Sequence, residues 1–517
     1  MKKSLFTAIS LITFAISFSQ ITESKLDDVV SRAMKTFNVP GIAVAIVKDG
    51  KVVISKGYGV TDISTQQKVD GNTLFGIASN SKAFTTAALG MLVDEKKLNW
   101  DDKVIKYIPE FKMYNDYVTN EFTIRDLLTH RSGLGLGAGD LMIWPDGHNF
   151  TPKDIVKNIQ YLKPVSGFRA EYDYDNLLYV IAGEVIERVS GKSWCEFVET
   201  KIMKPLQMDH SAASFRRLKD TTNIISPHVP TQGKLEVIKR YTNPIFDAAA
   251  GIYSSTNDLS KWVIAQLNDG KYGDNNEKQL FSSEVHNEMW TPQTILPIYG
   301  MKPYSCNFKS YGLGWQLSDI NGHLQVHHTG GLDGIVTQTI LFPDIKLGII
   351  VLTNQQSGAA FNSISNTIKD SYYGFNYPDH VEALYNERKA KENNADKITD
   401  EVWATVDENM MRRTKIDIQN YVGLYRDAWF GDIIINYRKG ALRFTSVRSP
   451  RLTGSLFFYK DHTFAVKWDN RSFHADAFMY FDLDTNGKAN HFKMKAISPL
   501  TDFSYDFQDL DFSKVSE

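Results

Sequence analysis

The sequence predicts an α+β protein followed by a small antiparallel β domain, and three observations lead to this prediction. Residues 78–93 contain no proline and carry apolar side chains at helical spacing. Residues 336–342 and 347–353 are short runs rich in β-branched and apolar residues, as in the strands of a sheet. From residue 418 onward, strand-like runs alternate with turns. Helices and strands are therefore mixed in the larger part of the chain, and strands dominate its last part.

Residues 1–19 are predicted to be a cleavable signal peptide of a bacterial exported protein. Lys2 and Lys3 precede an apolar run over residues 5–18, and small residues at its end suit cleavage before Gln20. The run is too short for a membrane span, and no later stretch approaches the length of a transmembrane segment. We therefore expect a periplasmic or secreted protein.

Ser79 and Lys82 form the most informative short motif of the chain. Because they are three residues apart in the predicted helix, they share one face of it. A serine hydroxyl is a poor nucleophile until a neighbour takes its proton, and a lysine can do so when burial disfavours its charged form. About two such spacings arise by chance in a chain like this, so the motif alone also fits a serine near a helix cap and a solvated lysine.

Tyr174 and Asn176 lie just before a second predicted helix, residues 177–191. The apolar side chains of this stretch recur at helical spacing, and Asn176 is predicted to be its N-cap. Tyr174 then lies in the loop that enters the helix. A phenol beside a lysine can pass a proton to a leaving group or activate a water molecule. The alternative interpretation is a packed aromatic residue followed by a helix cap.

The third motif ends an extended segment and consists of His328, Thr329, Gly330 and Gly331. Glycines at these positions let the backbone come close to a ligand. An edge strand can also offer its N–H and C=O groups to a peptide-like substrate.

A metal site is the competing interpretation, because His323, His327 and His328 are close together in the sequence. Alternation along a strand would send residues 327 and 328 to opposite faces, and no H-E-x-x-H motif accompanies them. The sequence therefore predicts no metal ion and no cofactor.

The order S-x-x-K, Y-x-N and H-T-G makes the chain resemble the serine β-lactamase and penicillin-binding-protein superfamily. It is most similar to the branch that holds class C β-lactamases, D-Ala-D-Ala carboxypeptidases, D-aminopeptidases and related esterases. The stretches TIRDLLTHRSGL at 123–134, AAGIYSSTNDLSKW at 249–262 and YGLGW at 311–315 agree with this. The resemblance covers roughly residues 24–375. It implies an α/β sandwich with an all-helical region and a catalytic cleft between the two.

The resemblance also implies roles for single residues. Ser79 would be the acylated nucleophile and Lys82 its proton acceptor, while Tyr174 would share in proton transfer. The substrate would be bound by Asn176, by His328 and Thr329, and by the glycines at 330 and 331. The backbone N–H groups of Ser79 and Gly331 would form the oxyanion hole.

The implied function is that of an exported serine hydrolase that forms an acyl-enzyme and cleaves amide or ester bonds. We expect a peptidase or amidase acting on D-amino-acid or cell-wall peptides, or an esterase. A true β-lactamase is an alternative, although class C enzymes usually carry a lysine where this chain has His328. A non-catalytic sensor or scaffold is the alternative outside enzymes, and the complete set of Ser79, Lys82 and Tyr174 argues against it.

The charge and cysteine content of the sequence limit the classes of partner and of covalent cross-link that we expect. The formal net charge of −2 gives no overall electrostatic case for nucleic acid, so the expected partner is a small-molecule or peptide substrate. Cys195 and Cys306 are the only cysteines of the sequence. They could form one disulfide in an oxidising compartment or remain two buried thiols.

Three parts follow the signal peptide in the predicted domain organisation. Residues 20–375 form the hydrolase domain, and residues 376–416 are a charged, glycine-poor stretch predicted to be a helical connector. Residues 417–517 are β-rich and resemble the small β-barrel module that follows the catalytic domain in some of these hydrolases. In such relatives the module can mediate oligomerisation or border the active site, so a homo-oligomer is one expectation and a passive domain is the other.

Overall fold

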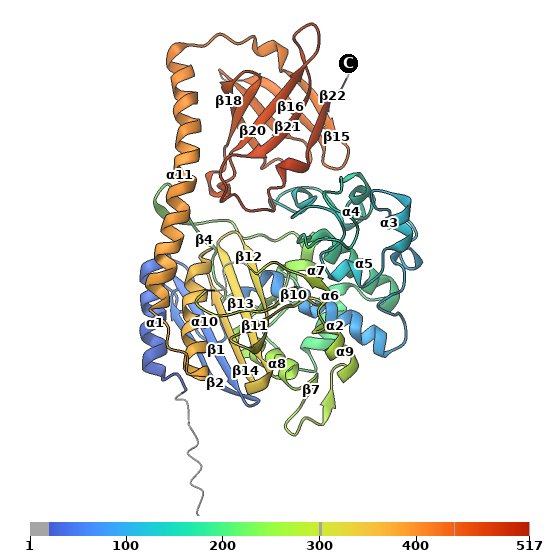
Figure 1. Ribbon diagram of the computed structural model, residues 1–517, viewed down its shortest axis with the longest axis vertical. Helices are drawn as coiled ribbons and strands as arrows, with labels where there is room; N and C mark the ends of the chain where they lie inside the picture. The colour runs from blue at the N-terminus through green and yellow to red at the C-terminus, as the bar shows by residue number, and fades with distance from the viewer. Residues whose placement is uncertain (1–19, 299–301, 439, 516–517) are drawn as a thin grey trace, which may run out of the picture.

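The computed structural model describes residues 20–298, 302–438 and 440–515 (Figure 1). The predicted signal peptide, residues 1–19, lies outside the described residues. The main sheet has eight antiparallel strands in the order β2-β1-β14-β13-β12-β11-β10-β9. These strands are β1 (Gly41–Lys48), β2 (Lys51–Gly59), β9 (Thr294–Ile295), β10 (Lys309–Tyr311), β11 (Gln316–Ile320), β12 (His323–Leu332), β13 (Ile335–Phe342) and β14 (Leu347–Thr353).

Strand β1 lies in the interior of this sheet and is buried on both faces. Its side chains belong in turn to two separate hydrophobic clusters. One cluster includes α1 (Glu23–Phe37) and α10 (Gly358–Tyr373), and the other includes α8 (Thr256–Leu267). Because side chains of a strand alternate between faces, the continuous apolar run of β1 reflects the helices on both sides.

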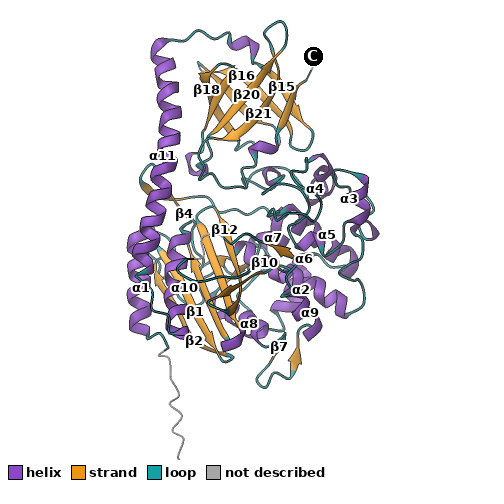
Figure 2. Cartoon of the chain, viewed as in Figure 1, coloured by secondary structure: helices purple, strands orange, loops and turns teal. Residues whose placement is uncertain are grey.

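A helical region lies beside the sheet, with α2 (Ser81–Asp94) at its centre (Figure 2). Almost every residue of α2 is buried, because α5 (Leu177–Ser190), α7 (Asp247–Ala250) and α9 (Ser283–Met289) pack around it. The shorter elements are α3 (Asp116–Glu121), α4 (Pro152–Asn158), α6 (Trp194–Val198), β3 (Phe75–Gly76) paired with β6 (Tyr253–Ser254), β4 (His228–Thr231) with β5 (Lys234–Val237), and β7 (Lys271–Tyr272) with β8 (Lys278–Gln279).

One long helix, α11 (His380–Arg412), connects the sheet to the C-terminal strands (Figure 1). Its 33 residues correspond to about 50 Å at the usual helical rise. Asp379 caps the helix by accepting hydrogen bonds from the backbone N–H groups of Val381 and Glu382. The helix packs on α1 and α10 near its start and on strand β18 near its end, where Val406 is buried.

The C-terminal domain is a closed antiparallel barrel of eight strands. Buried and more exposed residues alternate along its strands, as the interior and exterior of a barrel require. Pairing of the first strand with the last closes it. The strands are β15 (Gly423–Asp427), β16 (Gly431–Arg438), β17 (Ala441–Ser446), β18 (Thr453–Lys460), β19 (Thr463–Trp468), β20 (Ala477–Leu483), β21 (Ala489–Ala496) and β22 (Asp511–Lys514).

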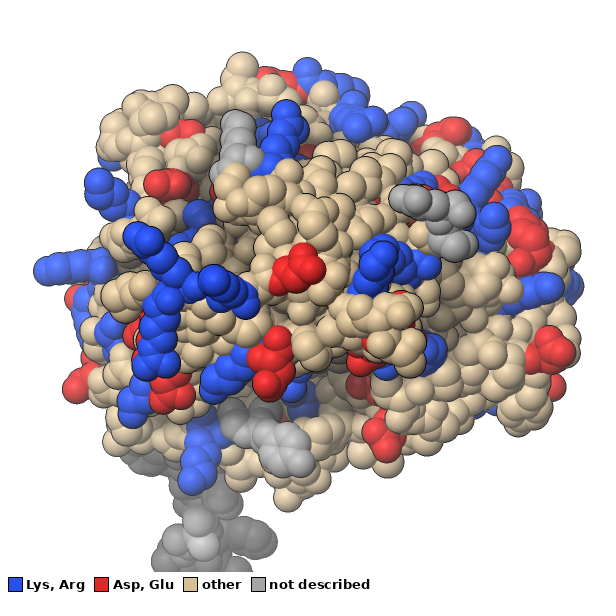
Figure 3. Space-filling model, turned by 90° about the horizontal axis from the view of Figure 1, so that it is seen from above, with Lys and Arg blue, Asp and Glu red and all other residues tan. Residues whose placement is uncertain are grey.

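The predicted fold class is confirmed: a sheet covered by helices, a helical region beside it, and then an antiparallel β-barrel (Figure 2). The connection between β21 and β22 leaves the barrel and packs on the helical region. We call residues 498–506 of this connection the docking segment. Seen from the barrel end, basic and acidic side chains are interspersed over the surface (Figure 3).

Two further expectations concern the described residues. Among them, no helix combines the length and the apolar character that a bilayer crossing needs. Cys195 and Cys306 are both free thiols, so within the described chain they form no disulfide. The Cys195 thiol instead donates to Asp247 Oδ2 at 3.4 Å.

Candidate functional site

Ser79 lies in a 3-10 turn, Ala78–Asn80, that leads directly into α2. The sequence predicts the first turn of an α-helix here, and the structure has a tighter turn at the same place. Ala78 has a φ of +49°, a left-handed conformation that residues with a side chain rarely adopt. Such backbone strain is often found at functional sites. Ser79 is half-buried and faces a cavity.

Strand β12 packs directly against this turn, and Gly330 makes the approach possible. A Cβ at Gly330 would lie 2.2 Å from the carbonyl oxygen of Ile77 and 2.9 Å from Cβ of Ala78. Thr337, opposite Gly330 on β13, donates from Oγ1 to the same carbonyl at 2.9 Å. A Cβ at Gly331 would meet no described atom within 4 Å, and Gly331 borders the cavity. Gly330 therefore brings the strand close, and Gly331 leaves room for a ligand.

Lys82 lies at the centre of the hydrogen bonds behind Ser79. Its Nζ donates to Ser79 Oγ at 3.0 Å, to Asn176 Oδ1 at 2.7 Å and to the carbonyl oxygen of Ala249 at 3.1 Å. The side chain is fully buried. The structure thus brings together the serine, the lysine and the asparagine of the first two motifs.

Burial lowers the pKa of Lys82 to about 7, while the negative charges of Asp140 and Asp175 act in the opposite direction. At this pKa a large fraction of the amine is neutral near pH 7. The neutral amine has a lone pair within hydrogen-bonding distance of the Ser79 hydroxyl, so it can accept that proton.

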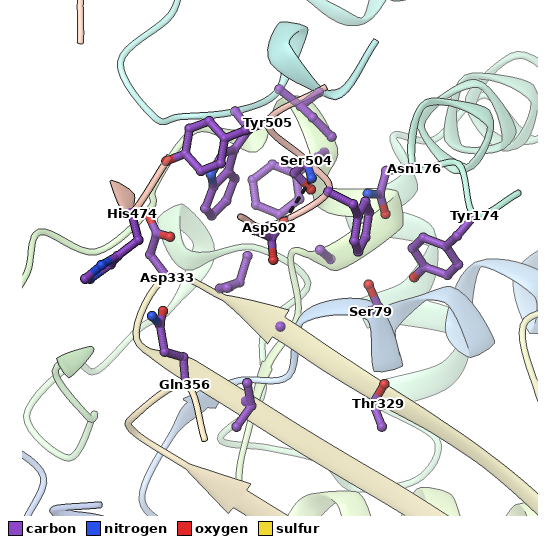
Figure 4. Close-up of a pocket in the computed structure, with 18 of the residues that line it drawn as sticks. Ser79, Tyr174, Asn176, Thr329, Asp333, Gln356, His474, Asp502, Ser504 and Tyr505 are labelled. Carbon is purple, nitrogen blue, oxygen red and sulfur yellow. Dashed lines mark hydrogen bonds between the residues drawn. The ribbon is translucent and has the colours of Figure 1, made fainter. Parts of the chain in front are cut away.

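Tyr174 directs its hydroxyl toward Ser79 (Figure 4). Its ring packs against His130 and Phe503, with centroids 4.2 Å and 5.7 Å away, and Lys82 Nζ lies 4.8 Å from the ring centre. Burial raises the pKa of Tyr174 well above its usual value, although a hydrogen bond with Ser79 opposes the shift. Tyr174 is therefore a neutral phenol near pH 7, suited to donate or relay a proton.

Asn176 occupies the predicted N-cap position of α5, but a different side chain supplies the capping hydrogen bond. Its backbone is already helical, with φ −79° and ψ −32°, and its side chain makes no capping hydrogen bond. Asp175 caps the helix instead, since its Oδ1 accepts from the backbone N–H of Leu177 at 2.9 Å. The Asn176 amide points into the site, where Oδ1 accepts from Lys82 and Nδ2 donates to Asp140 Oδ2 at 2.8 Å.

His328 and Thr329 lie where β12 borders the cavity. β11 pairs with β12 as far as His327, and from His328 onward the pairing of β12 continues with β13. The buried His328 ring has Nε2 2.9 Å from the Tyr311 hydroxyl and Nδ1 2.6 Å from the carbonyl oxygen of Thr329. Burial lowers the pKa of His328 to about 3, so the ring is uncharged at neutral pH. Thr329 directs its hydroxyl into the cavity near Ser79 (Figure 4).

The neighbouring histidines have separate surroundings. His323 pairs with Asp344 on the surface, at 2.6 Å between Nδ1 and Oδ2. His327 is close to Lys309 and Lys369, whereas His328 faces Lys82 and Tyr311. In the part of the chain that the structure describes, no group of three or more His, Cys, Asp or Glu side chains is placed to hold a metal ion.

A cavity of about 520 Å³ opens beside Ser79. Six of the eight predicted site residues line it. Of the other two, Lys82 lies behind Ser79, and Gly330 lies on the face of β12 that packs against the turn at Ala78. The six are Ser79, Tyr174, Asn176, His328, Thr329 and Gly331. Sequence motifs more than 240 residues apart therefore meet in one place.

The structure adds residues from the C-terminal domain that the sequence prediction missed. Ser504 and Phe503 of the docking segment line the cavity, and Ser504 Oγ donates to Asp140 Oδ2 at 2.9 Å. Asp506 fixes the segment by accepting the backbone N–H of Gly139 at 2.6 Å. The glycine-rich run 133–139 is the one local signal for this contact, because a Cβ at its Gly137 would lie 2.6 Å from the carbonyl oxygen of Phe503.

Comparisons with known proteins fit this geometry. "Unguisins hydrolase ungD'" of Aspergillus campestris (strain IBT 28561) is 28% identical over 339 residues, which cover 63% of this chain and 60% of that protein. "Protein flp" of Staphylococcus aureus (strain N315) is 30% identical over 341 residues, which cover 65% and 64%. The chain thus spans less than two thirds of the length of these relatives.

A solved structure has the same fold over nearly the whole chain. It is the octameric penicillin-binding protein homologue from Pyrococcus abyssi, with a TM-score of 0.61 and 22% identity, and the alignment covers 96% of this chain and 100% of that one. Residues 414–514 match a family described as a domain of unknown function (DUF3471). Residues 26–371 match the family model described as Beta-lactamase, and because this match covers more than half of the sequence, the chain belongs to the β-lactamase family.

Proposed function

We propose that this chain is an exported serine hydrolase that cleaves amide or ester bonds through an acyl-enzyme on Ser79. One observation carries the proposal: the buried Lys82 Nζ lies 3.0 Å from Ser79 Oγ, with a pKa lowered to about 7. A lysine in this state can take the hydroxyl proton as the oxygen attacks, which is what a serine nucleophile requires.

The reaction begins with attack of Ser79 Oγ on the substrate carbonyl carbon while its proton passes to Lys82. The negative charge that develops on the carbonyl oxygen is held by the backbone N–H groups of Ser79 and Gly331, and each such donor is typically worth a few kcal/mol. Tyr174 donates its phenolic proton to the leaving amine or alkoxide and regains a proton from the Lys82 ammonium. The C–N or C–O bond breaks and leaves the acyl group on Ser79.

Deacylation repeats these steps with water as the nucleophile. Lys82 and Tyr174 take one proton from water as it attacks the acyl carbon, and a proton returns to Ser79 Oγ as the ester bond breaks. Asn176 holds Lys82 through Oδ1. In this proposal it also contacts the substrate amide.

The proposed substrates are D-amino-acid or cell-wall peptides and their amides, together with simple esters. The cavity of about 520 Å³ has the size of a small-molecule or short-peptide site. The open part of β12 at Thr329 and Gly331 supports binding of an extended, peptide-like substrate along the strand.

Steady-state hydrolysis tests the proposal. Wild type, Ser79→Ala and the control Ser64→Ala are assayed with p-nitrophenyl acetate, D-alanine p-nitroanilide and a chromogenic cephalosporin. Ser64 is an exposed serine in a surface turn, hydrogen-bonded to Asp62, so its loss should leave turnover unchanged. We expect wild type and Ser64→Ala to hydrolyse the ester or the anilide, and we expect Ser79→Ala to have lost this activity. Turnover of the cephalosporin alone would replace the proposal with a β-lactamase, and equal activity of Ser79→Ala would overturn it.

Export and assembly belong to the same proposal. N-terminal sequencing of the protein from a bacterial periplasmic fraction is expected to begin at Gln20, and recovery of the intact N-terminus in the cytoplasm would contradict export. Association of copies through the C-terminal barrel also stays a prediction, which light scattering of the purified chain can test.

A further inference from the structure

A buried histidine lies directly against Tyr174 and takes no direct part in the proposed chemistry. His130 is fully buried, and its ring packs on the Tyr174 ring with centroids 4.2 Å apart. The rings of Tyr179 and Tyr311 also pack on it, at 5.4 Å and 4.6 Å. His130 therefore contacts the phenol that points toward Ser79, although it does not itself line the cavity.

His130 holds the backbone on both sides of Tyr174. Its carbonyl oxygen accepts the N–H of Asp173 at 2.9 Å, and its ring atom Nδ1 accepts the N–H of Asp175 at 3.1 Å. The carbonyl oxygen of Tyr174 itself accepts the N–H of Gly137 at 2.8 Å. Three hydrogen bonds thus fix three consecutive residues, and His130 accepts two of them.

The backbone conformation of His130 suits this double role. Its φ is +53°, in the left-handed region that histidine, asparagine and aspartate enter more readily than most other residues. With this conformation the carbonyl oxygen and the side chain of one residue both reach residues 173–175.

The His130 ring is neutral, and its hydrogen bond defines the tautomer. A ring nitrogen that accepts a hydrogen bond carries no hydrogen, so the hydrogen of the neutral ring is on Nε2. Burial lowers the pKa of His130 well below its usual value, and the nearby charge of Lys82 acts in the same direction. Nε2 has no hydrogen-bond partner among the described residues. Within the described chain, the bond to Asp175 is therefore the one hydrogen bond that the ring makes.

We propose that His130 is a positioning residue for Tyr174, and that its hydrogen bond to the Asp175 backbone keeps the phenol aimed at Ser79. This rests on the proposed function, in which Tyr174 gives its proton to the leaving group. A general acid must lie within hydrogen-bonding reach of the atom that it protonates, so geometry limits its action first. Loss of the bond would free the peptide unit that directly follows the phenol.

The lysine has separate support, so the two halves of the machinery can be told apart. Asn176 follows Asp175 in the chain, but its side chain is held by Lys82 at 2.7 Å and by Asp140 at 2.8 Å. These bonds do not involve His130. We therefore expect loss of the His130 acceptor to impair protonation of the leaving group more than attack by the serine.

The position of the phenol matters most for esters with a poor leaving group. p-Nitrophenyl acetate releases a stabilised phenolate that departs without a proton, whereas benzyl acetate releases an alkoxide that needs one. The two esters share the acyl group and carry a ring of similar size, so they place the same demands on Ser79 and Lys82. Their ratio of kcat/KM therefore reports proton donation by Tyr174 separately from the general integrity of the site.

His130→Phe keeps a ring but has no acceptor for the Asp175 N–H. We expect it to lower kcat/KM at least about tenfold for benzyl acetate and less than about threefold for p-nitrophenyl acetate, because general acid catalysis contributes more than this to a poor leaving group. His130→Asn is the conservative variant, since its Oδ1 can accept the same hydrogen bond and asparagine tolerates a positive φ. It is expected to recover most of the wild-type ratio. His130→Leu, which also lacks an acceptor, takes the place of a His130→Phe protein that does not fold.

Combination with Tyr174→Phe shows whether His130 acts through the phenol. In that background the leaving group has no phenolic donor, so His130→Phe should change kcat/KM for benzyl acetate by less than about twofold. The matched control is His286→Phe. His286 lies in α9, is also buried and also packs on an aromatic ring, that of Trp290 at 4.2 Å. Its replacement should leave the ratio of the two esters unchanged.

Amide hydrogen exchange measures the hydrogen bond without any catalysis. Mass spectrometry of peptides that contain residues 173–176 is expected to show exchange at least about tenfold faster in His130→Phe than in wild type, and near wild type in His130→Asn and His286→Phe. Equal losses for the two esters, an undiminished effect in Tyr174→Phe, a His130→Asn protein as impaired as His130→Phe, or unchanged exchange would each overturn the positioning role. If ester hydrolysis did not depend on Ser79, the proposed function would fail, and exchange would still decide whether His130 holds this segment.

Discussion

The Ser504 hydroxyl of the C-terminal domain donates a hydrogen bond of 2.9 Å to Oδ2 of Asp140 in the hydrolase domain. The same carboxylate oxygen accepts from Asn176 Nδ2 at 2.8 Å, and Asn176 Oδ1 accepts from Lys82 Nζ at 2.7 Å. Hydrogen bonds therefore run without a break from the barrel domain to the lysine beside Ser79. The C-terminal domain therefore helps to hold Asn176 and Lys82 in position beside Ser79.

Removal of the Ser504 hydroxyl tests this connection. Ser504→Ala is expected to lower kcat/KM by about two- to tenfold, because one hydrogen bond that holds Asp140, and through it Asn176, is lost. The measurement is steady-state hydrolysis of a neutral ester.

Two matched variants separate positioning from a general loss of structure. Ser504→Thr keeps a hydroxyl and is expected to restore most of the rate. Ser513→Ala removes an exposed serine of β22 and should have no effect. If Ser504→Thr were as slow as Ser504→Ala, the hydrogen bond would not be the cause.

Replacement of the lysine gives a larger effect. Lys82→Met is expected to lower the acylation rate by at least about 1000-fold, because among the described residues no other group that hydrogen-bonds to Ser79 becomes a base near pH 7. Methionine has a similar length and carries no charge into the buried site, so the melting temperature should stay within about 5 °C. Rapid-quench kinetics and a thermal melt provide the two measurements. Near-normal acylation by a folded Lys82→Met protein would refute the assignment of the base.

The pH profile follows from the Lys82 pKa of about 7. Below this pH the amine is an ammonium and cannot accept a proton, and above it the amine is neutral. We therefore expect kcat/KM for a neutral ester to rise through about pH 7 and then to level off. The Tyr174 phenol keeps its proton throughout this range because burial raises its pKa well above the usual value. A profile that is flat or falling between about pH 6 and 8 would contradict the model.

Alanine substitutions at two adjacent glycines are expected to affect the free energy of unfolding differently. Gly330→Ala is expected to reduce the free energy of unfolding by about 1–3 kcal/mol, because the new Cβ would lie 2.2 Å from the Ile77 carbonyl oxygen. Gly331→Ala has open space at the same atom and should change stability by less than about 0.5 kcal/mol. Urea denaturation of both variants measures the difference. Equal loss of stability would mean that strand β12 does not depend on close packing at Gly330.

The parts of the site that are local in the sequence could be predicted from it. Ser79 and Lys82 are one helical turn apart, so helix geometry alone places them together. Alternation along a strand likewise predicts that His327 and His328 separate, and the structure gives them different neighbours.

Other parts depend on tertiary contacts that no local pattern records. Ser504 and Asp140 are 364 residues apart, and the glycine-rich run before Asp140 allows a close approach without indicating which segment of the chain makes it. The side chain that caps α5 could not be predicted for a related reason. Asn176 holds the N-cap position, but its amide is engaged by Lys82 and Asp140, so the neighbouring Asp175 accepts the capping hydrogen bond.

Identification of the acylated residue is the most direct test of the central claim. The wild-type protein is acid-quenched during turnover of a p-nitrophenyl ester, and its intact mass and peptide map are recorded beside those of Ser79→Ala. The account predicts one acyl group, mapped to Ser79, that accumulates in the wild type and is absent from Ser79→Ala. Turnover with the adduct on another residue, or an equal adduct in Ser79→Ala, would contradict it.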